Sequence, residues 1–148
     1  MDQHRGILEK RVIDSDGIEL GVVAKDEGEF IEVSEGLFDE LLLKRTFIGK
    51  EEEDEVILKD SLHNLLVGLD VIDSKEVNIG KILEEVAAGD ILDMLLIETP
   101  EKEVLFITLE EIFKIDDAVT LDIELKEVKY RQKTHTPGNH IKHFLGFK

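Results

Sequence analysis

The chain has 148 residues, of which 42% are hydrophobic, 5% are aromatic and none is cysteine. This apolar content is sufficient for a packed core, whereas the lack of cysteine excludes disulfides, thiolate nucleophiles and zinc–thiolate sites. A net charge of −17 argues against contact between the body of the protein and a phosphate backbone. No apolar run reaches the roughly 18 to 20 residues of a membrane span, and the start lacks the features of a secretory signal, so we expect a cytoplasmic protein that does not bind membranes.

The first elements expected along the chain are strands. Residues 11–14 ("RVID") and 18–23 ("IELGVV") read as the two arms of a hairpin, and Asp16-Gly17 between them suits a type I′ turn. Further on, the acidic run 51–55 ("EEEDE") lies between apolar pairs. It therefore predicts a solvent-exposed loop between two strands rather than a cation site.

Much of the opening hairpin recurs 59 residues later. The stretch "VIDSDGIELG" (12–21) has a near copy in "VIDSKEVNIG" (71–80), which aligns Val12 with Val71 and Gly21 with Gly80. Lys75-Glu76 replaces Asp-Gly in the second copy, so we expect a different or longer turn there. "DEVIL" (54–58) likewise resembles "DAVTL" (117–121). The sequence therefore predicts a duplicated unit of about sixty residues, with one copy in 1–62 and the other in 66–129.

The rest of the second unit also favours strands. "DMLLIE" and "EVLFIT" are β-branched or apolar runs, and "TLEEIFKID" (108–116) predicts a short helical turn in which Thr108 and Glu111 form a capping box. A module of this size is marginal alone, and the apolar "SLHNLL" (61–66) between the units is unlike a free tether. We therefore expect a mainly β fold, in which two tandem small β-barrels pack together and are followed by a basic C-terminal tail.

The repeated phrase resembles the first hairpin of the PRC-barrel family. The segment "GLDVIDSKEVNIGKILEEV" (68–86) carries the likeness, and residues 66–128 are most similar to the C-terminal PRC-barrel domain of the ribosome maturation factor RimM through "LVGLDVID", "IGKI", "GDILDMLLIE" and "EEIFKID". The first unit resembles a more divergent PRC-type domain, as in tandem archaeal-type proteins. Ser61-Leu62 stand where RimM proteins carry the two tyrosines that contact a small-subunit ribosomal protein. The resemblance implies an adaptor fold.

Residues 130–148 form the expected basic tail. Its four cations leave −21 on the rest of the chain, since the whole carries −17. The candidate partner-binding residues are Arg131, Lys133, Lys142, Phe144, Leu145, Phe147 and Lys148. Two alternatives stay open for this tail: it orders on a partner, or its apolar residues dock on its own barrel. Its three histidines have a spacing that could ligate a metal, but no nearby carboxylate would orient a ring, so we predict no metal site.

No motif for catalysis or cofactor binding occurs in the sequence. There is no nucleophile with an adjacent base and no glycine-rich phosphate loop, so we predict no catalytic residues and no cofactor. The function predicted is a non-enzymatic adaptor that binds a macromolecule, such as a basic ribosomal or RNA-processing protein. Two alternatives are an enzyme or small-ligand binder that uses a cleft between the barrels, and an RNA-binding protein that uses the tail. The identity of the partner and the oligomeric state stay open.

Overall fold

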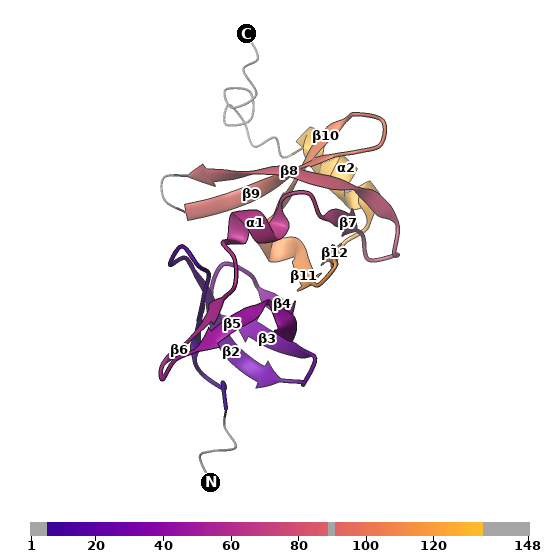
Figure 1. Cartoon of the computed structure of the whole chain (residues 1–148). Helices are drawn as coiled ribbons and strands as arrows, with labels where there is room; N and C mark the ends of the chain where they lie inside the picture. The colour runs from indigo at the N-terminus through magenta and orange to yellow at the C-terminus, as the bar shows by residue number, and fades with distance from the viewer. Residues whose placement is uncertain (1–5, 89–90, 135–148) are drawn as a thin grey trace.

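The computed structural model describes residues 6–88 and 91–134, and its fold is mainly β (Figure 1). The first half contains β1 (Arg11–Ile13), β2 (Glu19–Asp26), β3 (Phe30–Ser34), β4 (Glu40–Lys44), the short helix η2 (Arg45–Phe47), β5 (Ile48–Glu51) and β6 (Glu55–Leu58). Helix α1 (Leu62–Leu66) then leads to β7 (Asp70–Ile72), β8 (Asn78–Ala88), β9 (Ile91–Glu98), β10 (Val104–Thr108), η3 (Leu109–Glu111), β11 (Ile112–Ile115), β12 (Ala118–Leu121) and α2 (Leu125–Thr134). The mainly β class predicted from the sequence is confirmed.

The described strands form one sheet of twelve, in which the two halves have the same strand order. The order is β4-β3-β2-β1-β6-β5 in the first half and β10-β9-β8-β7-β12-β11 in the second. The first and sixth strands of each half pair in parallel, as β1 with β6 and β7 with β12, and the other pairs within a half are antiparallel. A parallel pair between β4 and β11 joins the halves. The duplication seen in the sequence is therefore a duplication of topology.

The register of the repeat is preserved to the residue. Val12 lies opposite Gly21 in the first hairpin, and Val71 lies opposite Gly80 in the second. Both glycines have a positive φ, near 150°, that side-chain-bearing residues rarely adopt. A Cβ atom at either position would also overlap a carbonyl oxygen of the neighbouring strand, that of Ser34 or Glu98. Only glycine allows this close approach of two strands, which explains why it stands at the same place in both copies.

A buried aspartate organises the turn after the first strand of each half. In the first half, Oδ1 of Asp14 accepts hydrogen bonds from the backbone N–H groups of Asp16 (2.9 Å) and Ile18 (2.8 Å). In the second half, Oδ1 of Asp73 accepts the same bonds from Lys75 (2.9 Å) and Val77 (2.8 Å). The two turns therefore share one hydrogen-bonding pattern.

This arrangement corrects two predictions about the turns. The first turn is not type I′, because that type needs a positive φ at both central residues and only Gly17 of the Asp16-Gly17 pair has one. The second turn is neither different nor longer, because Glu76 takes the position of Gly17 with φ +66°. The aspartate side chain, rather than the Asp-Gly pair, holds the turn, so the second copy keeps its shape without glycine.

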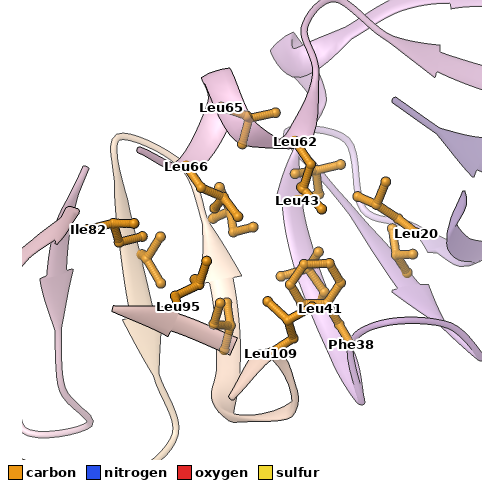
Figure 2. Packing of buried hydrophobic residues seen from close by; sticks show 14 of the residues in the cluster. Leu20, Phe38, Leu41, Leu43, Leu62, Leu65, Leu66, Ile82, Leu95 and Leu109 are labelled. Carbon is orange, nitrogen blue, oxygen red and sulfur yellow. The ribbon is translucent and has the colours of Figure 1, made fainter. Parts of the chain in front are cut away.

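One hydrophobic core runs through both halves. Helix α1 begins at a Ser61 cap, whose side chain accepts a hydrogen bond from Asn64 N–H, and buries its three leucines, Leu62, Leu65 and Leu66. Figure 2 shows these leucines between labelled side chains of the first half and of the second half, and all belong to one cluster. Buried residues of both halves therefore belong to one core. The "SLHNLL" segment is thus part of the core rather than a tether.

The predicted capping box is also confirmed. Thr108 and Glu111 bond each other's backbone N–H groups around η3, and Glu111 Oε1 lies 3.0 Å from the N–H of Thr108. The helical turn ends at Glu111, because the next four residues form strand β11. The acidic run likewise lies where expected, in the tight turn between β5 and β6, which the Glu52 N–H closes with a 2.7 Å bond to the Glu55 carbonyl.

Candidate partner-binding surface

Helix α2 is held on the second half at three points. Its first N–H group, from Leu125, donates to Asp73 Oδ2 at 2.8 Å, so the cap of the helix comes from a residue 52 positions earlier. Val128 is completely buried in the core. Near the other end, the side-chain amide of Gln132 bonds both backbone groups of Phe106 on β10: its Oε1 accepts from the N–H and its Nε2 donates to the carbonyl, both at 3.1 Å. The helix therefore has a fixed position.

An equivalent aspartate, Asp14, caps helix α1 in the first half. Oδ2 of Asp14 accepts a 2.7 Å hydrogen bond from the N–H of Leu62, the first residue of that helix. Each repeat thus uses one carboxylate to join its first turn to the helix that follows its sixth strand. Burial alone would raise the pKa of Asp73, but hydrogen bonds from the backbone N–H groups of Val77, Leu125 and Lys75 together lower this pKa below its usual range.

Two of the predicted partner-binding residues lie on this helix. Arg131 and Lys133 are in the second half of α2, although their side chains are outside the described part of the structure. The other five predicted residues, Lys142, Phe144, Leu145, Phe147 and Lys148, lie outside the described residues, as do the three histidines of the tail. Residues 130–134, expected to begin the tail, are helical. The structure therefore anchors the start of the basic segment on β10.

The exposed side of α2 carries charged and aromatic groups. Lys126 is exposed, Tyr130 is 68% exposed, and Lys129 Nζ lies 3.8 Å from a carboxylate oxygen of Glu103 in the turn between β9 and β10. Such a solvent-exposed ion pair contributes no more than about 1 kcal/mol. Cations in the last turns of a helix are favoured by the helix dipole. This side of α2 therefore exposes lysines and an aromatic ring.

A pocket of about 370 Å³ lies in the second half. It is lined by Asp70, Asn78, Gly80, Lys81, Glu98, Thr99, Pro100 and Lys102. Lys81 Nζ lies 2.7 Å from Asp70 Oδ1, and the hydrogen bond from this lysine lowers the pKa of Asp70. Lys102 Nζ lies 3.9 Å from Glu98. Since its cations already face carboxylates, the pocket offers no concentrated charge to a ligand.

The first half closes the corresponding surface. Gly36 there packs on Leu20 and on Gly21, the counterpart of Gly80, and the Leu37 N–H donates to the Leu20 carbonyl at 3.0 Å. A second pocket, of about 340 Å³, lies in the first half beside Lys10 and the β5–β6 turn. Each of these two pockets lies within one half, so neither is the cleft between the halves that an enzyme or small-ligand binder was expected to use.

Within residues 6–88 and 91–134, no group of three or more histidine, aspartate or glutamate side chains is placed to hold a metal ion. The helices in that part of the chain are also too short to cross a membrane. His63 carries a 54% exposed side chain, with Nδ1 3.5 Å from Glu85 Oε1 on β8.

Asp14, Asp73 and Gln132 have structural roles that the sequence analysis did not assign. The roles of the two aspartates could have been predicted from the sequence. Each aspartate ends the repeated "VID", and its carboxylate is the only side chain of that motif that accepts hydrogen bonds. Gln132 leaves no such signal, since its partner Phe106 is 26 positions away.

No protein-family model matches the chain, and no similar sequence is found among the curated proteins.

Proposed function

We propose that this protein is a non-enzymatic adaptor, built from two tandem PRC-type β-barrels, that binds a basic protein of ribosome assembly or RNA processing. The repeated six-strand order supports the tandem assignment, because each half pairs its first and sixth strands and so brings its ends together. The repeated Asp-to-helix cap supports it as well, because it makes each half a complete unit.

The observation that carries the proposal is the anchoring of α2. Asp73, Val128 and Gln132 fix the helix on the second half, so the basic segment that starts at Arg131 begins from a defined point on the body. Beyond it, the sequence offers Phe144, Leu145 and Phe147 as apolar anchors beside lysines. Segments of this composition order on contact and gain affinity from a few buried anchors. A fixed start lowers the entropy that such ordering costs.

The charge of the body favours a basic partner. Residues outside the tail carry −21, because the tail contributes four of the cations of a chain whose net charge is −17. Complementary charge raises association rates and suppresses contact with acidic partners, and its effect falls as salt rises. Body and tail would then have different tasks, with the acidic body attracting a basic partner and the apolar residues of the tail holding it.

The test is a capture experiment with three baits. These are the full chain, a chain that ends after Thr134, and a full chain with Phe144→Ser and Phe147→Ser. The truncation keeps Gln132 and therefore the described fold, which circular dichroism would check. We expect the full chain to retain basic proteins from native cytoplasm at low salt, and both altered baits to lose most of them. Mass spectrometry would identify the proteins, and nuclease treatment would show whether RNA mediates the contact.

Two outcomes would contradict the proposal. If the full chain retains no basic protein, the adaptor function is wrong. If capture disappears after nuclease treatment, the partner is RNA, and the number of phosphate contacts follows from the slope of affinity against salt.

A further inference from the structure

The two outermost strands of the sheet are copies of the two strands that join its halves. Among the described strands, the sheet ends in β10 on one side and β5 on the other, whereas β4 and β11 pair at its centre. β10 lies 64 positions after β4, at Val104–Thr108 against Glu40–Lys44, and β11 lies 64 positions after β5, at Ile112–Ile115 against Ile48–Glu51. The two outer edges therefore repeat two edges that pair with each other at the centre of the sheet.

The central pair shows which strand each outer edge would fit. β4 and β11 run parallel, with Leu42 opposite Lys114 and Leu43 opposite Ile115. The same register can be applied to the outer strands by shifting each residue by the 64 positions of the repeat. It then places Phe106 of one chain opposite Lys50 of another chain. The occupant that the fold itself specifies for the β10 edge is thus β5 of a second copy.

Gln132 occupies this edge at the decisive residue. Its side-chain amide bonds the N–H and the carbonyl of Phe106, which are the groups that a neighbouring strand would use. Nε2 also donates to the Val128 carbonyl at 2.9 Å, which orients the amide. The residue that matches Phe106 in β4 is Leu42, and there strand β11 is the neighbour. The Gln132 amide thus bonds the β10 edge in the second half, at the position where strand β11 pairs with β4 in the first half.

The length of the helix accounts for this difference between the halves. α1 and α2 start at matching positions under matching aspartate caps, but α1 ends at Leu66 and α2 continues to Thr134. The counterpart of Gln132 would be Leu69, which lies beyond the end of α1. The short helix leaves the β4 edge to β11, and the long helix covers the β10 edge.

The β5 edge is a weakened version of β11. Exposed Glu51 replaces the buried Ile115, and Gly49 replaces Phe113. Charged and short edge strands oppose pairing between chains. One edge is therefore covered by an amide and the other is made polar.

We propose that the edge of β10 is a docking surface for β5 of a second copy, and that Gln132 holds this surface closed. The contact is heterologous, since two different strands meet. Each added chain would present a new β10 edge, so opening the edge leads to head-to-tail assemblies, which are open chains or, where the rotation closes, rings.

The test uses Gln132→Ala, with Lys126→Ala as the matched control on an exposed site of the same helix. Gln132→Glu serves as a second variant, because it keeps the size of the side chain but cannot donate to the Phe106 carbonyl. Circular dichroism checks that each variant is folded, and sedimentation velocity over a range of concentrations measures mass. We expect both Gln132 variants to form larger species as concentration rises, and Lys126→Ala to match the wild type. Folded Gln132 variants with unchanged mass would overturn the proposal.

Cross-linking identifies the strands that meet. The chain has no cysteine, so cysteines introduced as Lys50→Cys in one preparation and Val104→Cys in another are the only thiols present. Both sites are exposed, on β5 and β10 respectively. In the Gln132→Ala background, a short bismaleimide should join the two preparations when mixed and leave either preparation alone largely unjoined. Preferential linkage of Lys50→Cys to itself would overturn the head-to-tail contact.

Discussion

Replacing Asp73 by alanine tests the buried carboxylate that joins the first turn of the second half to α2. The side chain is 2% exposed and accepts three backbone hydrogen bonds, two from the turn at Lys75 and Val77 and one from Leu125. Alanine removes all three acceptors and leaves the donors to find water or stay unpaired. Asparagine keeps an oxygen for the turn but presents an amide group to the Leu125 N–H.

The expected cost follows from these three bonds. Loss of a helix cap costs about 1 kcal/mol, and each turn hydrogen bond contributes roughly 0.5–1.5 kcal/mol net. We therefore expect Asp73→Ala to lower the free energy of unfolding by about 3 kcal/mol, and Asp73→Asn by about 1 kcal/mol, because only the cap is lost. This is a large part of the total for a small protein, which is typically about 5–15 kcal/mol.

Urea denaturation followed by circular dichroism measures these differences. Asp14→Ala should behave like Asp73→Ala, because the same three bonds occur in the first half. The control is Asp16→Ala, which removes an exposed side chain and keeps the backbone N–H that bonds Asp14. If Asp73→Ala and Asp16→Ala unfold at the same urea concentration, the repeated carboxylate does not stabilise the fold, and the reasoning from hydrogen bonds is refuted.

Three further expectations concern the second half. Gly80→Ala should destabilise the protein by several kcal/mol in urea denaturation, because φ +149° and the overlap with a carbonyl oxygen both oppose a Cβ atom. Glu76→Gly should raise stability by roughly 0.5–1 kcal/mol, since Glu76 has φ +66° where the first half has Gly17, and an unchanged or lower urea midpoint would contradict this. Stability should fall as pH drops below about 4, because the pKa of Asp73 is below its ordinary value and its ionised form is favoured in the folded state; Asp73→Ala should show a smaller fall.

The sequence predicted the fold best where the information is local or repeated. The "VIDS" phrase and the two glycines set the hairpin register in both copies, and the structure follows it at Val12–Gly21 and Val71–Gly80. The capping box at Thr108 is a contact across three residues and was equally visible. The apolar leucines between the repeats are also a local signal, and they lie in the core as this pattern indicated.

The sequence did not predict features whose partners lie far along the chain. The first N–H group of helix α2 is capped by Asp73, which lies 52 positions earlier in the chain. The helix sequence "LKEVKYRQKT" has only two aliphatic residues, so it lacks the apolar stripe from which an amphipathic helix is predicted. The contact of Gln132 with the edge of β10 depends on that helix and was hidden with it. The type I′ turn was wrong because a side chain rather than a dipeptide decides its geometry.

The continuous core gives a consequence for any partner that touches both halves. Leu62, Leu65 and Leu66 sit in one cluster with residues of each half, and strand β4 pairs directly with β11 (Figure 1). Two modules on a flexible linker bind with an effective local concentration that depends on linker length. Here no linker separates the halves, because they share one core and one sheet. A partner that fits both gains the full second contact without a linker penalty, and one that fits only a single half gains nothing from the duplication.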